Sequence, residues 1–272
     1  MIFAIDEKVC LWYNTYCKGW VYAGIRPRNE KRRSEMLRLE NIVWNLEDGR
    51  GILNDVSLEI PDNKLVVITG PNGGGKTTLA KTVAGLITPE SGRIIFDGED
   101  ITGLDITQRA KKGISYAFQQ PVRFKGLTVR DLLELAAGRE LKQVEVCEIL
   151  GKVGLCKNDY IDREVNASLS GGEIKRIEIA TVLARNTKLS IFDEPEAGID
   201  LWSFAGLVDV FKEVKEKING TLMIISHQER ILEIADEIIV ISKGKVENCG
   251  TADEILPTLV SGSRAPRPCE RS

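Results

Sequence analysis

The segment that most constrains the fold is residues 65–77, where the apolar run LVVIT leads directly into GPNGGGKT. An apolar run of this length predicts a buried strand, and the residues from Lys76 onward predict a helix. The loop between them fits the phosphate-binding pattern GxxxxGK[ST], which requires a strand before it and a helix after it. The sequence therefore predicts a phosphate-binding loop at the end of a buried strand. A glycine-rich turn followed by a chance Lys-Thr pair is the competing interpretation, and this context disfavours it.

The residue types in this loop have a physical reason. Glycines let successive backbone N–H groups point at phosphate oxygens, and the start of the helix adds partial positive charge. Lys76 is expected to reach the β- and γ-phosphates, and Thr77 to offer its hydroxyl to Mg²⁺. The residues expected to contact nucleotide here are Gly70, Pro71, Asn72, Gly73, Gly74, Gly75, Lys76, Thr77 and Thr78.

Short apolar segments alternate with helical patterns along most of the chain. The expected strands are residues 36–44, 65–69, 93–96, 114–118, 189–192, 222–225 and 238–241. The expected helices are residues 128–138 and 142–153, together with those that begin at residues 76 and 170. Such alternation predicts an α/β fold with a mainly parallel sheet covered by helices on both faces. The early strands and turns between residues 36 and 60 predict an antiparallel addition.

The composition excludes several classes of protein. The chain has 272 residues, of which 43% are hydrophobic and 28% charged, so it is not a disordered or collagen-like chain. A net charge of −3 gives no strong field toward nucleic acid, and neither nucleic-acid binding nor direct membrane insertion is expected. The cysteines form no CxxC pair and no secretory signal precedes them, so free thiols and a cytoplasmic location are expected.

The two ends of the chain differ in character from the part between them. Residues 1–35 are rich in aromatic residues, end in a basic run and show no lasting period, whereas a strand pattern begins at Met36. This segment is either a functional extension or a stretch outside the folded domain, and the pattern that restarts at a methionine favours the second. The expected organisation is an extension at 1–35, a folded domain at 36–260 and a polar, disordered tail at 261–272.

Polar residues stand where several of the expected strands end. Asp193 and Glu194 follow LSIF, His227 follows LMII after one serine, and Gln119 follows ISYAF. Ligands of open α/β sheets bind beyond the carboxyl ends of the strands, so all four are expected near the nucleotide. Asp193 is expected to hold Mg²⁺ through water, and Glu194 to polarise the attacking water.

The other two strand-end residues have less specific expected roles. His227, the only histidine, is expected to contact the γ-phosphate, and the amide of Gln119 to reach Mg²⁺ or the attacking water. Taken alone, each of these strand-end residues also has a plainer interpretation as a helix cap or a polar surface residue.

Residues 169–173, LSGGE, precede an expected helix. Ser170 and Glu173 have the spacing of a capping box, and a glycine-rich helix start with a free serine is also an anion site.

With this segment the sequence resembles the ATP-binding cassette (ABC) ATPases, whose motifs follow in the same order. Residues 70–77 resemble Walker A, Gln119 the Q-loop glutamine and residues 169–173 the LSGGQ signature. Asp193-Glu194 resembles Walker B with its catalytic glutamate, Asp200 the D-loop aspartate and His227 the switch histidine. The resemblance covers residues 36–260.

The resemblance implies a P-loop NTPase with a RecA-like core, an antiparallel β subdomain and a helical subdomain near residues 120–180. It implies an ATPase with ATP and Mg²⁺ as ligands, in which Lys76, Glu194 and His227 are catalytic. Thr77, Gln119 and Asp193 are then the residues nearest the metal. It also implies that two copies form a head-to-tail homodimer when ATP binds. In that dimer the signature segment of each copy covers the ATP bound to the other copy. The residues of that composite site are Ser170, Gly171, Gly172, Glu173 and Asp200.

The chain departs from the family pattern in four places. Gly74 stands where serine is usual, which is expected to remove only a hydroxyl, and Glu173 replaces the glutamine of LSGGQ. Ala197 replaces the D-loop serine, which is expected to weaken coupling between the two sites. Trp44 lies near the place of the aromatic residue that stacks on adenine, but its strand position equally allows a core role.

Within the family, local segments are similar to the SufC-type ATPases of iron–sulfur cluster assembly. These are AFQQPV at 117–122, SGGEIKRIEI at 170–179, and the acid Glu196. They favour an ATPase that drives a SufB/SufD-like scaffold, with any cluster held by that partner. Pro195 is typical of transporters instead, and the alternative is an ATPase subunit docked on membrane permease subunits. A DNA-repair or translation ATPase is disfavoured, because the long insertions of those chains are absent.

Overall fold

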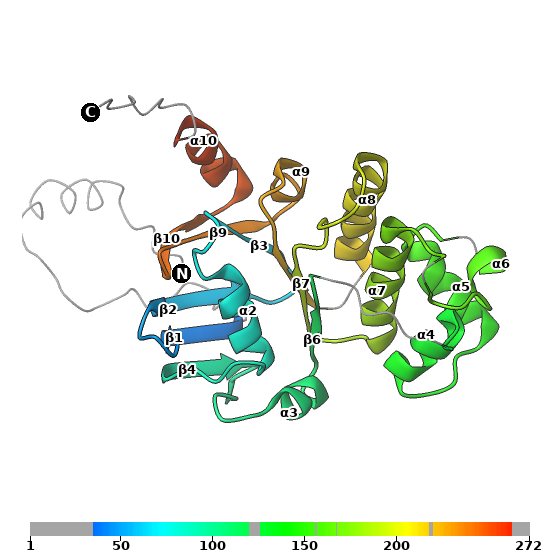
Figure 1. Ribbon diagram of the computed structural model, residues 1–272, viewed down its shortest axis with the longest axis horizontal. Helices are drawn as coiled ribbons and strands as arrows, with labels where there is room; N and C mark the ends of the chain where they lie inside the picture. Colours follow the sequence, from blue (N-terminus) through cyan, green and yellow to red (C-terminus); the bar gives the residue numbers. More distant parts are fainter. Residues whose placement is uncertain (1–34, 120–125, 156, 167, 218–219, 263–272) are drawn as a thin grey trace, which may run out of the picture. The chain divides into compact units, whose positions relative to one another are not determined.

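Strands and helices alternate along the chain as the hydrophobic pattern predicts (Figure 1). The computed structural model describes residues 35–119, 126–155, 157–166, 168–217 and 220–262, so the expected N-terminal extension and most of the tail lie outside the described residues. The strands are β1 (Glu35–Asn45), β2 (Gly51–Pro61), β3 (Leu65–Thr69), β4 (Ser91–Phe96), β5 (Glu99–Asp100), β6 (Ile114–Ala117), β7 (Leu189–Asp193), β8 (Thr221–Ile225), β9 (Glu237–Ser242) and β10 (Lys245–Gly250). The helices are α2 (Lys76–Ala84), α3 (Ile106–Lys111), α4 (Val129–Ala137), α5 (Gln143–Lys152), α6 (Lys157–Tyr160), α7 (Gly171–Arg185), α8 (Leu201–Lys217), α9 (Glu229–Leu232) and α10 (Ala252–Gly262).

The central sheet has the strand order β10-β9-β3-β8-β7-β6. Strands β9, β3, β8, β7 and β6 pair in parallel, and the edge strand β10 pairs antiparallel with β9. A second sheet, in the order β2-β1-β4-β5, is antiparallel throughout. Both expectations, a mainly parallel core and an antiparallel addition, are confirmed. The parallel pairing also brings the carboxyl ends of β3, β6, β7 and β8 to one edge of the sheet.

Alternate residues of the parallel strands belong to two separate apolar clusters. Leu65 and Val67 of β3 pack with residues of α4, α7 and α8, whereas Val66 and Ile68 pack with residues of α2, β1 and β2. Successive strand residues point to opposite faces, so a strand buried on both faces carries a continuous apolar run. This explains why LVVIT shows no alternation of polar and apolar residues.

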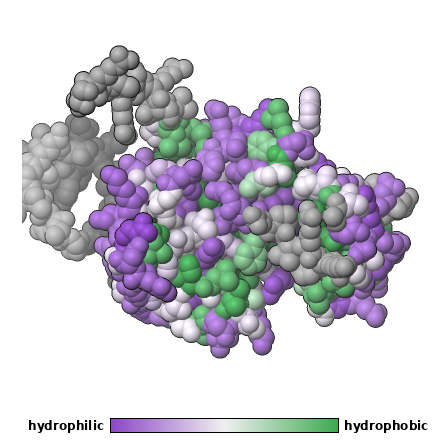
Figure 2. All heavy atoms as spheres, in the orientation of Figure 1, coloured by the Kyte–Doolittle hydropathy of each residue, from purple (hydrophilic) through white to green (hydrophobic). Residues whose placement is uncertain are grey.

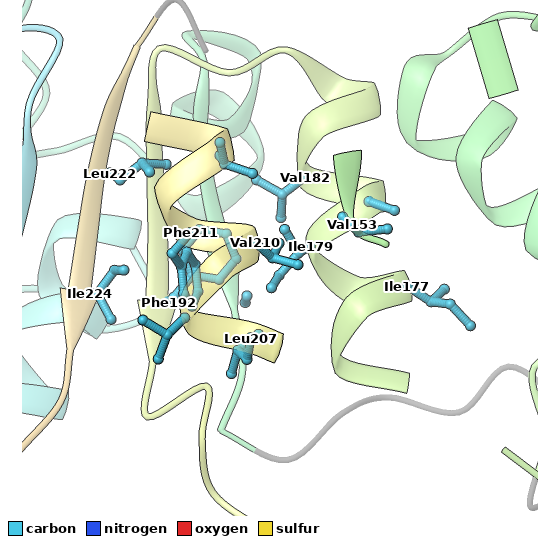
Figure 3. Packing of buried hydrophobic residues seen from close by; sticks show 14 of the residues in the cluster. Val153, Ile177, Ile179, Val182, Phe192, Leu207, Val210, Phe211, Leu222 and Ile224 are labelled. Atoms are coloured by element: carbon cyan, nitrogen blue, oxygen red, sulfur yellow. The ribbon is translucent and has the colours of Figure 1, made fainter. Parts of the chain in front are cut away.

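Helices α7 and α8 cover one face of the central sheet. Their apolar side chains pack with those of β7 and β8 in the cluster that also contains Leu65 and Val67. Figure 3 shows Ile179 of α7 and Val210 of α8 turned toward each other, with Phe192 of β7 beside them. Phe192 meets Phe211 of α8 edge to face, with ring centroids 5.2 Å apart, which is a favoured aromatic geometry. This packing fixes β7, and with it the acidic residues at the end of that strand.

Helices α4, α5 and α6 supply the helical region expected near residues 120–180. Helix α4 begins with a capping box between Thr128 and Asp131 and ends at Gly138, whose φ of 69° is readily adopted by glycine. Val129 and Leu133 of α4 and Val146 of α5 are fully buried in the same cluster as α7. Capping signals and helical spacing therefore account for the boundaries of α4.

Most strand and helix boundaries lie within one or two residues of those expected, and two of the differences have a clear physical reason. Strand β6 ends at Ala117 rather than at residue 118, because the carbonyl oxygen of Phe118 accepts a hydrogen bond from the buried Lys175 ammonium at 2.9 Å instead of extending the pairing. Helix α10 continues to Gly262, so two residues assigned to the tail are helical. The polar composition of that segment hid the continuation of the helix. None of the described helices combines the length and apolar character that a membrane crossing requires.

Candidate functional site

The phosphate-binding loop joins β3 to α2, as the motif predicts. Gly70, Gly73 and Gly75 have φ values of 133°, 75° and 103°, which favour glycine. Lys76 is 5% exposed, and its ammonium donates hydrogen bonds to the carbonyl oxygens of Gly70 at 2.8 Å and Pro71 at 3.0 Å. Burial lowers the pKa of Lys76, while the nearby carboxylates at the end of β7 raise it. The loop thus holds a cation at its centre, beside two acids.

Gly74 does more than omit a hydroxyl, which corrects the expectation from sequence. A Cβ atom at this position would lie 2.8 Å from the carbonyl oxygen of Ile241 and 2.9 Å from that of Pro71, so the backbone would have to shift. The N–H of Gly244, in the turn between β9 and β10, donates to the carbonyl oxygen of Gly74 at 3.0 Å. The missing side chain lets the carbonyl oxygen of Ile241, near the end of β9, approach the loop closely.

Thr77 and Asp193 meet where α2 begins and β7 ends. The Thr77 hydroxyl donates to Oδ1 of Asp193 at 3.1 Å, and Asp193 is 2% exposed. Hydroxyl and carboxylate oxygens suit Mg²⁺, which usually takes one or two carboxylates and completes its shell with water and phosphate. The described residues contain no group of three or more His, Cys, Asp and Glu side chains that could hold a metal ion by itself. The donor set therefore fits a Mg²⁺ ion that shares its coordination with a nucleotide.

Tyr116 is a residue of this site that the motifs did not reveal. Its hydroxyl donates to Oδ2 of Asp193 at 2.7 Å, and burial together with this hydrogen bond raises the pKa of Tyr116. Tyr116 lies opposite Ile191 in the parallel register, and Asp193, two residues further along β7, points to the same face. Side-chain parity on adjacent strands is the signal that could have found it.

Gln119 and Glu194 are joined by a hydrogen bond from Nε2 to Oε2 at 2.6 Å. Glu194 has a φ of 44°, an uncommon conformation for a non-glycine residue that is often found at functional sites. Its N–H donates to the carbonyl oxygen of Ile225 at 3.0 Å, which ties the end of β7 to the end of β8. The structure thus places Gln119 on Glu194, whereas its role toward the metal stays a prediction.

His227 follows β8 at the same edge of the sheet. Its side chain is exposed and makes no hydrogen bond to the described residues. Its charge is close enough to lower the pKa of Glu196. The placement is the one that the strand pattern predicts, and contact with a γ-phosphate stays a prediction.

The signature residues form a second group with Asp200. Ser170 and Glu173 make the predicted capping box of α7, with the Ser170 hydroxyl accepting from the Glu173 N–H at 3.2 Å. A Cβ atom on Gly172 would lie 2.5 Å from the hydroxyl of Ser203, which donates to Asp200 at 2.7 Å. Among the described residues, no hydrogen bond joins this group to the phosphate-binding loop, and in the view of Figure 1 α2 and α7 lie on opposite sides of β7.

Trp44, which could either stack on adenine or belong to the core, is half-buried. It lies in β1 and packs against the cluster that contains α2 and the antiparallel sheet. Both interpretations remain compatible with that position.

Known proteins share this fold and these motifs. A family model described as ABC transporter matches residues 53–197. An uncharacterised ABC transporter ATP-binding protein of Methanocaldococcus jannaschii is 40% identical over 214 residues, which cover 76% of this chain and 85% of that protein. The sulfate/thiosulfate import ATP-binding protein CysA of Synechocystis sp. is 36% identical over 208 residues, which cover 75% of this chain and 57% of CysA. A crystal structure of a nucleotide-free ATP-binding cassette from an ABC transporter matches with a TM-score of 0.72 and 29% identity, covering 84% of this chain and 95% of that one.

Proposed function

Because this chain belongs to the ABC transporter family of ATP-hydrolysing cassettes, we propose that it is the ATP-binding subunit of a membrane transporter. The observation that carries the ATPase assignment is the meeting of Lys76, the Thr77–Asp193 pair and the Gln119–Glu194 pair at one edge of the sheet. The names of the relatives, which include a sulfate/thiosulfate import ATP-binding protein, support the transporter role. The cassette is residues 36–260, and it works on the cytoplasmic side of the membrane.

Each side chain at this edge then has a role in ATP hydrolysis. Lys76 would exchange its two carbonyl partners for β- and γ-phosphate oxygens, and Thr77 and Asp193 would hold Mg²⁺, which would neutralise phosphate charge when bound. Glu194 accepts the proton of the attacking water, and Gln119 orients the carboxylate that does so. His227 contacts the γ-phosphate.

An exposed apolar surface supports a permease partner. Leu86, just after α2, and Ile106, which begins α3, are 39% and 40% exposed. In Figure 2 an apolar area lies where Figure 1 places α2 and α3. Exposed apolar groups that gather on one surface often mark a site of protein association.

The second candidate is an ATPase that acts on a SufB/SufD-like scaffold of iron–sulfur cluster assembly. Residues 170–179 and the acid Glu196 favour it. Pro195 and the names of the relatives favour the transporter, which we therefore place first.

A co-purification experiment separates the two partners. We expect the tagged chain, extracted with detergent from its own cells, to retain a permease with several membrane spans. Recovery of a soluble scaffold protein instead, from both membrane and soluble fractions, would establish the second candidate and contradict the transporter role.

ATP is expected to convert the chain from a monomer to a homodimer. The signature group and the phosphate-binding loop are separate within one chain, so a second copy can supply Ser170 and Gly172 to each nucleotide. Analytical ultracentrifugation of a slowly hydrolysing variant with Mg-ATP measures this change, and the same variant without nucleotide is the control. A chain that stays monomeric at all concentrations, with its partner present, would contradict the composite site.

A further inference from the structure

The carboxylate of Glu196 reaches from the segment after β7 to the segment after β8. Its Oε1 accepts a hydrogen bond from the Ser226 hydroxyl at 2.5 Å. The same hydroxyl accepts the N–H of Gln228 at 3.0 Å, and the N–H of Ser226 donates to the carbonyl oxygen of Ile68 at 3.2 Å. Ser226 is completely buried. The residue between Ser226 and Gln228 is His227, so these bonds fix the backbone on both sides of the histidine.

Stability of the fold does not explain an acid at position 196. Oε2 of Glu196 is buried and has no hydrogen-bond partner among the residues that the structure describes. Burial raises the pKa of Glu196, an effect that the Ser226 hydroxyl and the nearby His227 oppose and that Glu194 adds to. A buried carboxylate with an unpaired oxygen costs folding free energy, and groups of this kind gather at functional sites.

We propose that Glu196 is a positioning residue for hydrolysis, which holds residues 226–228 through the Ser226 hydroxyl and so keeps the His227 imidazole at the nucleotide. The imidazole is exposed and makes no hydrogen bond to the described residues. Its position therefore depends on how firmly the backbone of residues 226–228 is held. The inference rests on the proposed ATPase function. It assigns a role in hydrolysis to Glu196, a residue to which the motifs assign no role in the site.

Three variants test the link by kinetics. We expect Glu196→Ala to lower kcat about tenfold, the upper end of what one hydrogen bond contributes, with ATP affinity unchanged. Glu196→Gln should stay close to the wild-type rate, because its amide oxygen can accept the same hydrogen bond. Added to a His227→Ala background, Glu196→Ala should cause no further loss, since both changes remove one function. The exposed Glu233→Ala, beyond α9, is the matched control.

A wild-type rate for Glu196→Ala, or a further tenfold loss in the His227→Ala background, would overturn the inference. Loss of ATP affinity in Glu196→Ala would overturn it too, because that result indicates a disturbed phosphate site. If the wild-type chain itself does not hydrolyse ATP, it is the proposed function that fails.

Nuclear magnetic resonance supplies a readout that does not depend on hydrolysis. His227 is the only histidine, so a protein purified without a histidine tag gives the imidazole signals of one residue. We expect Glu196→Ala to shift or split these signals, and Glu196→Gln and Glu233→Ala to leave them in place. Unchanged signals in Glu196→Ala would show that the carboxylate does not order this segment.

Discussion

Replacing Glu194 by glutamine is expected to reduce ATP turnover by about 10²–10⁴-fold, the usual contribution of a positioned general base. Glutamine keeps the length and hydrogen-bonding reach of the side chain, including a partner for Gln119, but it cannot accept a proton from water. It also removes a negative charge that we expect to face the γ-phosphate, so ATP affinity should hold or rise. The measurements are kcat and the ATP Kd at saturating Mg²⁺.

Variants of two other residues at the site separate the role of Glu194 as a general base from the binding of metal and nucleotide. Asp193→Asn should weaken the dependence on Mg²⁺, because Oδ1 of Asp193 lies beside the Thr77 hydroxyl, where the metal is expected to bind. His227→Ala should lower the rate while ATP binding stays near normal, as expected for a contact made in the transition state. Glu247→Gln, an exposed acid on β10, is the control. Turnover of Glu194→Gln at the wild-type rate would mean that the site uses another base or only binds nucleotide.

The elements that position the site could be predicted because their cause is local. LVVIT, LSIF and LMII are short apolar runs whose burial on both faces of the sheet leaves no alternative to a central strand. The ends of such strands share one edge of a parallel sheet, so the polar residues that follow them had to gather there. The capping box at Ser170 is likewise a pattern of adjacent residues.

The remaining site contacts depend on how distant strands are aligned, which the sequence does not state. Tyr116 meets Asp193 because the parallel register of β6 and β7 sets Tyr116 opposite Ile191. Glu196 meets Ser226 only because β7 and β8 end side by side. Such contacts are visible once the register is known, and no motif encodes them.

At Gly74, too, a contact with a distant segment of the chain decides the role of the residue, and the sequence alone does not reveal it. From sequence the absent side chain is a lost hydroxyl, whereas in the fold a Cβ atom at this position would come within 2.8 Å of the carbonyl oxygen of Ile241. The distant strand β9, together with the loop's own Pro71, therefore determines what this loop position tolerates. Serine at this position would require β9 or the loop backbone to shift.

Replacing Lys76 by alanine or methionine is expected to raise the ATP Kd by roughly 10- to 100-fold, because the phosphates lose charge-assisted hydrogen bonds from the ammonium. Lys76 is buried in the loop beside Asp193 and Glu194, which places its charge at the centre of the expected phosphate site. Methionine keeps most of the volume of the lysine stem, which separates loss of charge from loss of packing.

Equilibrium binding of labelled ATP measures the effect, and thermal unfolding of the same variants shows that the loop without its lysine still folds. Lys81→Ala, on the same helix, removes a cation whose side chain makes no hydrogen bond or ion pair to the described residues, and it should bind ATP as the wild type does. If the alanine and methionine variants are folded and keep wild-type affinity, the ammonium does not bind phosphate, and the assignment of residues 70–77 as the nucleotide site is wrong. If methionine binds as the wild type does and alanine does not, packing of the lysine stem rather than its charge holds the loop in its binding conformation.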